Sequence, residues 1–339
     1  MVAREIEYVE LYVGDQQSAV DYFVSRFGFR QVAESAVDDT RSTLLRQGTV
    51  KIIVTAGPKT WKFLDGHGDG IADIALTCDD VDATVEAAAA AGATVSRSFR
   101  GHPVVTGFGD VGHTLLPATG GPADRLPAIG DWTPSSAPDG PAGRIRKLDH
   151  VAVCLAGGTL EQHADYYGAA LGLNRYFSEY VAVGDQAMDS IVVRSASGEV
   201  TFTLVAPDLT KSPGQLDAFL GRNGGPGVQH LAFLVDEIVP AVREYGDLGV
   251  EFLNTPDTYY EMLADRFTGM TEEIGQLRET NVLADRDEWG YLLQLFTRSP
   301  YEANTLFYEL IQRRGSRGFG SRNIRALYEA VERDRLIAD

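Results

Sequence analysis

Two histidines and one glutamate are residue types that could together bind a metal ion. His150 and His230 each lie in an alternating, strand-like run, LDHVAVCL and GPGVQHLAF, and Glu309 lies in TLFYELIQRR. If that last segment is extended, Glu309 shares one face with Phe307 and Ile311, which places an acid among apolar neighbours. A buried carboxylate needs a cation, a hydrogen-bond network or a shifted pKa. Two imidazoles and one carboxylate from three strands could bind one face of Fe(II) and leave the other face open.

Other interpretations of these residues remain open. A single histidine in a strand is more often a core or surface residue than a metal ligand, and Glu309 could pair with a nearby arginine. Zinc competes for a His2Glu set, although its helical HExxH signature is absent. The remaining histidines lack this strand arrangement, and we expect them on the surface or in loops: His67, His102, His113 and His163.

An internal duplication supports the interpretation of the two histidines as functional residues. IEYVELYV at 6–13 precedes AVDYFVSRFGF, as LDHVAVCL at 148–155 precedes HADYYGAALGL, and GDGIADIAL matches GPGVQHLAF. Several matches in the same order indicate two copies of one unit. Tyr8 then corresponds to His150 and Asp73 to His230. The second copy therefore has imidazoles at two positions where the first has none.

The repeated unit reads as a strand, a helix and further strands, which predicts an α+β fold. We expect two tandem domains built from βαβββ repeats, with mixed sheets curved around a pocket. Residues 117–146 contain six of the fourteen prolines and many small residues, which predicts a linker. It would separate an N-terminal domain at 1–116, without metal ligands, from a metal-binding domain at 147–339.

Length and composition limit the class of protein. The 339 residues suit two domains, and 44% hydrophobic with 23% charged residues is ordinary for a globular chain. A net charge of −18 repels phosphate backbones and opposes nucleic-acid binding. Cys78 and Cys154 lie in apolar strands and indicate neither disulfides nor a thiolate metal site. No signal peptide or membrane-spanning run is evident, so we expect a cytoplasmic protein without membrane contact.

A glycine-rich turn, GFGSRN at 318–323, leads into an amphipathic stretch near the C-terminus. It lacks the lysine of a P-loop and the strand context of a dinucleotide-binding turn, so we do not expect a phosphate site. The apolar residues that follow recur at helical spacing: Ile324, Leu327, Tyr328 and Val331. We interpret this stretch as a C-terminal lid helix over the metal pocket, where it would exclude water.

These motifs resemble the 4-hydroxyphenylpyruvate dioxygenase family of the vicinal-oxygen-chelate superfamily. The resemblance rests on LDHVAV, GPGVQHLAF, FLNTPDTYYEML, LADRDEWGYLLQLFT and LFYELIQRRGSRGFGSRNIRALYEAVER, in this order. It is close over about residues 147–335 and looser over the first half. It implies two glyoxalase-like domains, Fe(II) ligation by His150, His230 and Glu309, and an α-keto acid substrate that supplies its own two electrons.

The family contains two chemistries that share a substrate. One branch converts 4-hydroxyphenylpyruvate to homogentisate, and the other hydroxylates its benzylic carbon to give 4-hydroxymandelate. Thr203 and Val205 stand where the first branch has Pro and Asn, and Ile324 stands where it has an aromatic residue. All three resemble the second branch. A shorter side chain at 324 would let the substrate ring shift, and Val205 removes an amide that could bind polar intermediates. Neutral drift in the core is the alternative.

The resemblance also assigns pocket residues and partners. Further positions match the family's substrate site: Ser190, Gln215, Gln294, Phe296 and Phe319. Capping of a strand edge explains Gln215 equally well. The resemblance implies an Fe(II) oxygenase that forms 4-hydroxymandelate for antibiotic-type metabolism, with 4-hydroxyphenylpyruvate and O2 as partners and a homodimer as one open arrangement. The alternatives are homogentisate formation, a non-catalytic ligand-binding or resistance protein, and a zinc lyase or isomerase.

Overall fold

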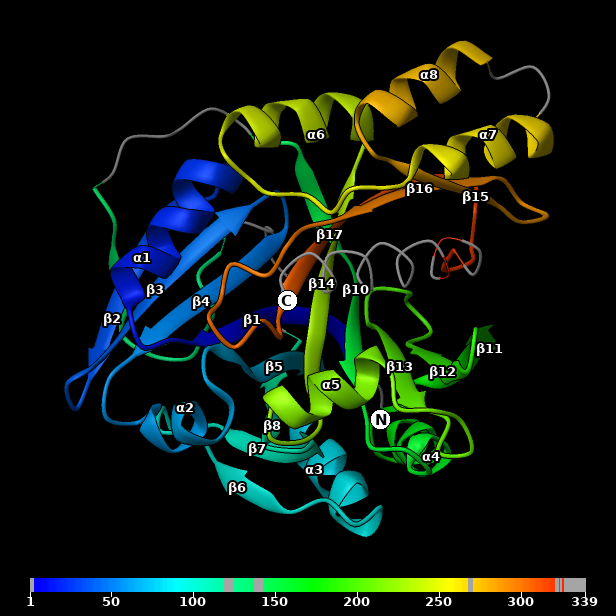
Figure 1. The fold of residues 1–339 in the computed structure, drawn as a ribbon. Helices are drawn as coiled ribbons and strands as arrows, with labels where there is room; N and C mark the ends of the chain where they lie inside the picture. Colours follow the sequence, from blue (N-terminus) through cyan, green and yellow to red (C-terminus); the bar gives the residue numbers. More distant parts are fainter. Residues whose placement is uncertain are drawn as a thin grey trace.

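The computed structural model of this chain describes residues 3–118, 125–136, 143–267 and 271–320, with Asn323 and Arg325. Two mixed β-sheets lie side by side, and helices cover their outer faces (Figure 1). The sequence predicted an α+β fold of two tandem domains, and this prediction is confirmed. The expected lid helix from Ile324 to Val331 lies outside the described residues.

The first sheet has nine strands within the described residues, in the order β6-β7-β8-β5-β1-β4-β3-β2-β9. They are β1 (Ala3–Tyr12), β2 (Arg30–Val37), β3 (Thr40–Gln47), β4 (Val50–Ala56), β5 (Gly70–Cys78), β6 (Val95–Arg97), β7 (Pro103–Phe108), β8 (Val111–Pro117) and β9 (Thr133–Pro134). Its helices are α1 (Gln16–Asp21) with the π-helical turn η1 (Tyr22–Arg26), α2 (Trp61–His67) and α3 (Val81–Ala90).

The second sheet has eight strands in the described part of the chain, in the order β11-β12-β13-β10-β14-β17-β16-β15. They are β10 (Ile145–Cys154), β11 (Asn174–Val183), β12 (Gln186–Arg194), β13 (Thr201–Pro207), β14 (Gly227–Val235), β15 (Leu283–Arg286), β16 (Tyr291–Phe296) and β17 (Phe307–Arg314). Its helices are α4 (Leu160–Leu171), α5 (Gln215–Arg222), α6 (Ile238–Asp247), α7 (Asp257–Arg266) and α8 (Thr271–Glu279).

The two sheets repeat one pattern of strand pairing. In the first, β1 runs parallel to β4 and antiparallel to β5, and β5 runs parallel to β8. In the second, β10, β13, β14 and β17 pair in the same way. The registers agree as well, because Tyr8 pairs with Ala75 and His150 pairs with Ala232. The duplication read from the sequence is therefore present in the backbone.

Part of the proline-rich segment belongs to the first sheet. β9 adds an antiparallel edge strand beside β2. Ile129 is buried in a small apolar cluster, against which Leu126 and Trp132 pack. The apolar residues between the prolines therefore pack into a small hydrophobic cluster. The linker-like composition of the segment does not reveal this packing.

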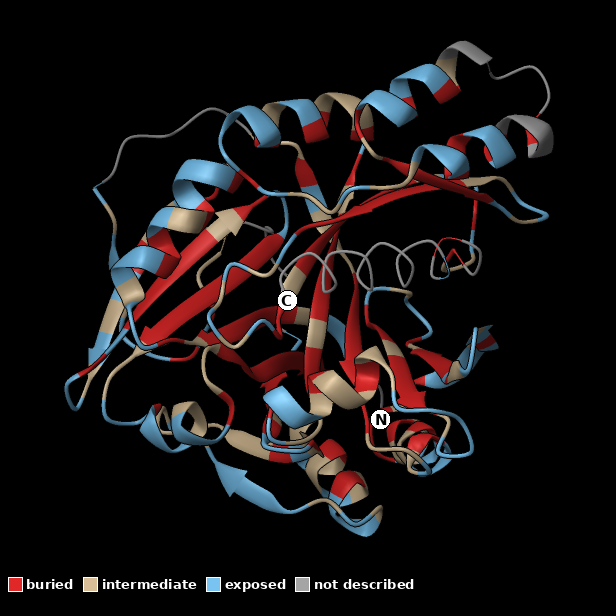
Figure 2. Cartoon of the chain, in the orientation of Figure 1, coloured by how far each residue is buried: buried red, intermediate tan, exposed pale blue. Residues whose placement is uncertain are grey.

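The two domains share one hydrophobic core. Phe23 and Phe27 of the first domain contact Tyr308 of β17, with ring centroids 5.4 and 5.7 Å apart. Phe27 also lies 6.2 Å from Phe233 and 5.2 Å from Tyr245. The strands are largely buried, and the helices expose only their outer faces (Figure 2). This packing fixes the second sheet against the first domain.

Two of the histidines expected on the surface or in loops are buried within regular elements, so that expectation is wrong for them. His113 on β8 is fully buried, with Nδ1 3.0 Å from the Ile74 carbonyl oxygen and Nε2 2.9 Å from the Tyr167 hydroxyl. His67 contacts the carbonyl oxygen of Asn223 through Nδ1 and the carboxylate of Asp110 through Nε2. Burial is tolerated because both ring nitrogens of each histidine are paired.

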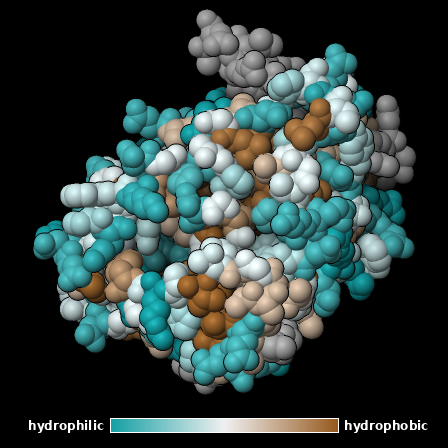
Figure 3. All heavy atoms as spheres, turned by 90° about the horizontal axis from the view of Figure 1, so that it is seen from below, coloured by the Kyte–Doolittle hydropathy of each residue, from teal (hydrophilic) through white to brown (hydrophobic). Residues whose placement is uncertain are grey.

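The outer surface is mainly hydrophilic. In the face seen from below in Figure 3, hydrophilic residues predominate and hydrophobic residues gather in small separate patches. None of the described helices has the length and apolarity that a bilayer span requires. Cys78 and Cys154 are both buried and free, as the sequence predicted.

Candidate metal centre and its cavity

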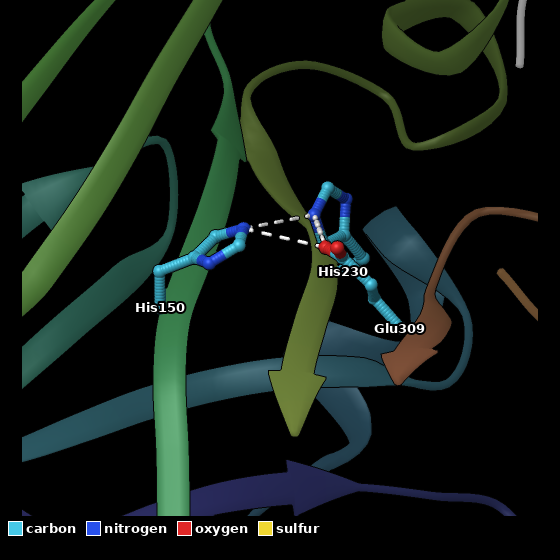
Figure 4. A group of neighbouring side chains, drawn as sticks. All are labelled: His150, His230 and Glu309. Atoms are coloured by element: carbon cyan, nitrogen blue, oxygen red, sulfur yellow. Dashed lines mark hydrogen bonds and ion pairs between the residues drawn. The ribbon is translucent and has the colours of Figure 1, made fainter. Parts of the chain in front are cut away.

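His150, His230 and Glu309 converge because three neighbouring strands present them on one face. Ala232 of β14 pairs with His150 of β10 on one side and with Glu309 of β17 on the other. His230 precedes Ala232 by two residues, so it points to the same face of the sheet. The methyl group of Ala232 leaves space between the three longer side chains, which point toward one another (Figure 4).

The three donor atoms form a compact triangle. The two Nε2 atoms are 3.4 Å apart, and Glu309 Oε2 lies 3.4 Å from His150 Nε2 and 3.2 Å from His230 Nε2. Donors bound at right angles and about 2.1 Å from one ion are about 3.0 Å apart. The spacing therefore suits a divalent metal bound on one face. It is the only such group of three among the described residues.

Hydrogen bonds behind the rings orient both imidazoles. His150 Nδ1 lies 2.9 Å from Asp149 Oδ1, and His230 Nδ1 lies 3.2 Å from Gln229 Oε1. An acceptor at Nδ1 favours the tautomer with its proton there, which leaves the Nε2 lone pair for a metal. Burial lowers the pKa of His230, against the opposing effect of Glu309, so the neutral ligand form is favoured.

The carboxylate of Glu309 is buried and incompletely paired. Its residue is 1% exposed, and Oε1 has no hydrogen-bond partner among the described residues. An unpaired buried carboxylate oxygen is costly, and a cation at the triangle would remove that cost. Both the donor chemistry and this orphaned oxygen fit a bound metal. The same donors occur in zinc sites and in non-haem iron sites, where the open face binds substrate and O2.

A cavity of about 360 Å³ opens on the free side of the triangle. Its volume is in the range of sites for small organic molecules. Six of the predicted pocket residues line it together with the three ligands: Thr203, Val205, Gln215, Gln294, Phe296 and Phe319. Ser190 is not among the described lining residues, and its hydroxyl donates to the Glu179 carbonyl oxygen at 3.0 Å. Ile324 lies outside the described residues.

Gln294 is held in a fixed orientation within this wall. Phe296 pairs with Glu309 across β16 and β17, so Gln294, two residues away, faces the same side. Its Oε1 accepts a hydrogen bond from the Asn323 amide at 3.0 Å, and Asn323 Oδ1 in turn accepts one from the Tyr259 hydroxyl at 2.9 Å. The Gln294 NH2 group is thereby left as the donor available to a molecule in the cavity.

Several lining residues were not predicted from the sequence. Phe307 stacks on His230 with ring centroids 5.0 Å apart, and Thr305 Oγ1 is buried with no partner in the described structure. Apolar side chains complete the walls: Ala152, Met188, Leu216, Phe219 and Leu253. Strand alternation placed Phe307 on the face of Glu309 without assigning it to the cavity, and the same alternation could have identified Ala152 and Thr305. No signal of that kind marks the side chains from α5.

The first domain has different residues at the positions of the triangle. Asp73 pairs with Gly112 as His230 pairs with Phe307, so Thr114 corresponds to Glu309. Asp73 accepts a hydrogen bond from the backbone N–H of Thr114 at 2.9 Å. Burial raises the pKa of the Asp73 carboxyl to about 7. These residues offer no imidazole, so the duplicated scaffold carries its His2Glu set in the second domain.

Comparison with known proteins agrees with this fold. Residues 5–110 and 149–266 each match the Glyoxalase/Bleomycin resistance protein/Dioxygenase superfamily. The chain is 30% identical to 4-hydroxyphenylpyruvate dioxygenase of Aspergillus fumigatus and 28% identical to that of Yarrowia lipolytica, each over 98% of this chain and 92% of the relative. A solved structure of a triple-substitution variant of 4-hydroxymandelate synthase from Streptomyces coelicolor is 51% identical, with a TM-score of 0.90. That match covers 99% of this chain and 100% of the solved one.

Proposed function

Because this chain belongs to the 4-hydroxyphenylpyruvate dioxygenase family, a family of non-haem iron dioxygenases, we propose that it is an Fe(II)-dependent 4-hydroxymandelate synthase. Its substrates would be 4-hydroxyphenylpyruvate and O2, and its products 4-hydroxymandelate and CO2. One oxygen atom of O2 ends in the new carboxylate and the other in the benzylic hydroxyl, while the original carboxyl group leaves as CO2. The atoms balance without a second keto acid.

The observation that carries this proposal is the His2Glu triangle at the wall of an organic-sized cavity. His150, His230 and Glu309 would hold the metal, with donors 3.2–3.4 Å apart. When bound, Fe(II) supplies the redox centre at which O2 is reduced by electrons from the keto acid. Other non-haem metals would occupy the same donors, so the choice of iron rests on the family.

The rest of the cavity would bind and orient the substrate. Phe296 and Phe319 provide aromatic surface for its ring, and Gln294 offers its NH2 group to a polar end of the molecule. Apolar side chains from α5 and β16 would limit the access of water to the substrate, which would protect reactive species from side reactions. Gln215 and Ser190 are assigned weaker roles, as a polar wall residue and as a support for β12.

The surroundings of Val205 support the benzylic product over the ring-hydroxylated one. Val205 is buried in an apolar cluster with Met188, Leu216 and Phe219. It therefore offers no hydrogen bond to a polar ring intermediate. Ile324 removes the aromatic surface that the homogentisate branch has at this position. A substrate ring that is less tightly confined could shift and bring the benzylic carbon, instead of the ring, close to the oxidant. The rate at each carbon depends on its distance from the oxidant at the ångström scale.

Homogentisate formation is the second candidate, since the curated relatives named above are 4-hydroxyphenylpyruvate dioxygenases. Product analysis separates the two. The Fe(II)-loaded protein would be incubated with 4-hydroxyphenylpyruvate and O2, and the products separated by chromatography against authentic standards, because they share a mass. We expect 4-hydroxymandelate. Homogentisate alone would overturn the product assignment and keep the metal site.

Two further outcomes test the enzyme class. Protein that binds 4-hydroxyphenylpyruvate but neither takes up Fe(II) nor consumes O2 would indicate a ligand-binding protein on the same scaffold. Turnover that persists under strict anaerobiosis with zinc would indicate a lyase or isomerase. Either result would contradict the proposed oxygenase.

A further inference from the structure

A buried ion pair lies directly behind the metal ligand His150. Asp149 Oδ1 is 2.9 Å from His150 Nδ1, and Arg313 of β17 donates to both carboxylate oxygens of Asp149 at 2.8 Å. The side chains of Asp149 and Arg313 are 9% and 19% exposed. Paired, fork-like hydrogen bonds of this kind fix geometry as well as charge.

A β-bulge explains how Asp149 reaches the ring of its own neighbour. Leu148 pairs with Phe233 and His150 pairs with Ala232, so Asp149 is an extra residue without a partner on β14. In a regular strand, adjacent side chains would point to opposite faces. A bulge re-aims one of them, and bulges are common beside active sites for this reason.

The first domain contains the same bulge, but the acid at the bulge makes different contacts. Ile6 pairs with Leu76 and Tyr8 with Ala75, which leaves Glu7 as the extra residue. Glu7 is buried and binds Lys51 at 3.0 Å and Arg125 at 3.0 Å. An acid at the bulge is thus common to both copies, but only in the second copy does it contact an imidazole of the metal triangle.

Arg313 also holds the turn that carries Phe319. Its Nη1 donates to the carbonyl oxygen of Gly318 at 2.7 Å, and its guanidinium lies 5.1 Å from the centroid of the Phe319 ring. That ring packs edge-on against His150, with centroids 5.3 Å apart. The contacts form a closed circuit from His150 through Asp149, Arg313 and Phe319 back to His150.

We propose that Asp149 and Arg313 are positioning residues that couple the orientation of His150 to the placement of Phe319. The metal ligand and the aromatic wall of the substrate cavity are then set by one ion pair. A displacement of the His150 ring would shift the Phe319 ring through the ion pair, and the reverse also holds. Metal affinity and substrate affinity therefore depend on each other. This inference rests on the proposed metal site.

The test uses Co(II), whose visible absorption reports ligand geometry without turnover. The full-length protein would be titrated with Co(II), and Asp149→Asn and Arg313→Lys compared with Glu7→Gln, the equivalent bulge acid of the first domain. We expect Asp149→Asn and Arg313→Lys to weaken Co(II) binding by roughly 10- to 100-fold and to change its spectrum. Glu7→Gln should leave affinity and spectrum unchanged, even if it lowers thermal stability.

The coupling itself is measured by a double-mutant cycle with Phe319→Leu. If Asp149 and Phe319 act through one circuit, their effects on Co(II) affinity are non-additive by at least roughly threefold. Wild-type Co(II) binding in folded Asp149→Asn, or strictly additive effects, would overturn the inference. Absence of Co(II) binding in the wild type would instead overturn the metal site on which the proposed function stands.

Discussion

Glu309 and His230 face each other from neighbouring parallel strands, with Oε2 and Nε2 3.2 Å apart. Glu309 supplies the carboxylate of this group of three, and its Oε2 also lies 3.4 Å from His150 Nε2. Glu309→Gln keeps the shape of the side chain but removes its charge. We expect metal affinity to fall by more than about 100-fold, beyond the effect typical of residues that only support a ligand, and turnover to be lost.

Metal content after dialysis and O2 uptake measure this effect. Glu288→Gln is the matched control, because Glu288 is exposed on the surface and should bind metal and turn over as the wild type does. Full metal content in Glu309→Gln would remove Glu309 from the ligand set.

Metal removal should destabilise the fold. A ligand that binds only the native state stabilises it by about 2.7 kcal/mol when present at 100 times its dissociation constant. We expect a chelator to lower the unfolding midpoint of the metal-loaded wild type, measured by circular dichroism under anaerobic conditions. The same chelator should have no effect on Glu309→Gln, and an equal shift in both proteins would show that the chelator acts elsewhere.

The Ile324→Phe substitution should shift the product toward homogentisate. A phenyl ring at this position would confine the substrate ring and present it, instead of the benzylic carbon, to the oxidant. The product ratio is measured by chromatography, with Ile324→Leu as the control that keeps an aliphatic side chain. An unchanged ratio in Ile324→Phe would remove this residue as a determinant of the product.

Asn323→Ala should weaken substrate binding through Gln294. The variant loses the hydrogen bond that fixes the Gln294 amide, so the glutamine is free to rotate. The loss of one such bond costs about 0.5–1.5 kcal/mol, which corresponds to a rise in KM of roughly two- to tenfold. Steady-state kinetics should show a smaller change in kcat. Gln276→Ala, at an exposed position of α8, serves as the control, and an unaltered KM in Asn323→Ala would contradict the role of Asn323.

The buried imidazole of His113 should make stability depend on pH. Burial lowers the pKa of His113 to about 4, from 6.5 in an exposed histidine. Protonation therefore favours the unfolded chain: the contribution of His113 is complete above pH 6.5 and is lost as the pH falls from 6.5 toward 4. The loss amounts to about 3 kcal/mol at most.

Urea unfolding at pH 8 and pH 5 measures this loss. The raised pKa of Asp73 gives a slope of the opposite sign between pH 3.8 and about 7, so wild type must be compared with His113→Gln. We expect the variant to lose less stability between pH 8 and pH 5 than the wild type does. Equal losses would contradict a neutral His113 in the native state.

Strand alternation and the duplication were enough to single out the three residues that meet at the candidate metal centre. His150 and His230 occupy matched strand positions, and Glu309 interrupts an apolar face, so each leaves a signal in the sequence. The ion pair behind His150 left none. It depends on a bulge that inserts Asp149 into β10, and alternation assigns that residue to the wrong face.

The errors have a similar cause. His113 was expected at the surface or in a loop because it lacks the strand arrangement of His150 and His230, yet it lies on β8 and Tyr167 of the other domain is 2.9 Å away. Similarly, β9 lies among prolines and small residues, and its pairing with β2 appears only in the folded sheet. The pocket role of Ser190 stays a prediction, and its hydroxyl donates to the backbone of β11, a contact that the sequence did not indicate.

The spacing of the three ligands has a consequence for the order of events during synthesis. His150, His230 and Glu309 are roughly eighty residues apart, and the third lies on β17, the last described strand. A chain still emerging from the ribosome presents two imidazoles and no carboxylate at this site, and so binds metal weakly. The three candidate ligands come together only after β17 has docked beside β14. The metal centre is therefore completed late, together with the part of the cavity wall that Phe319 supplies from the turn after β17.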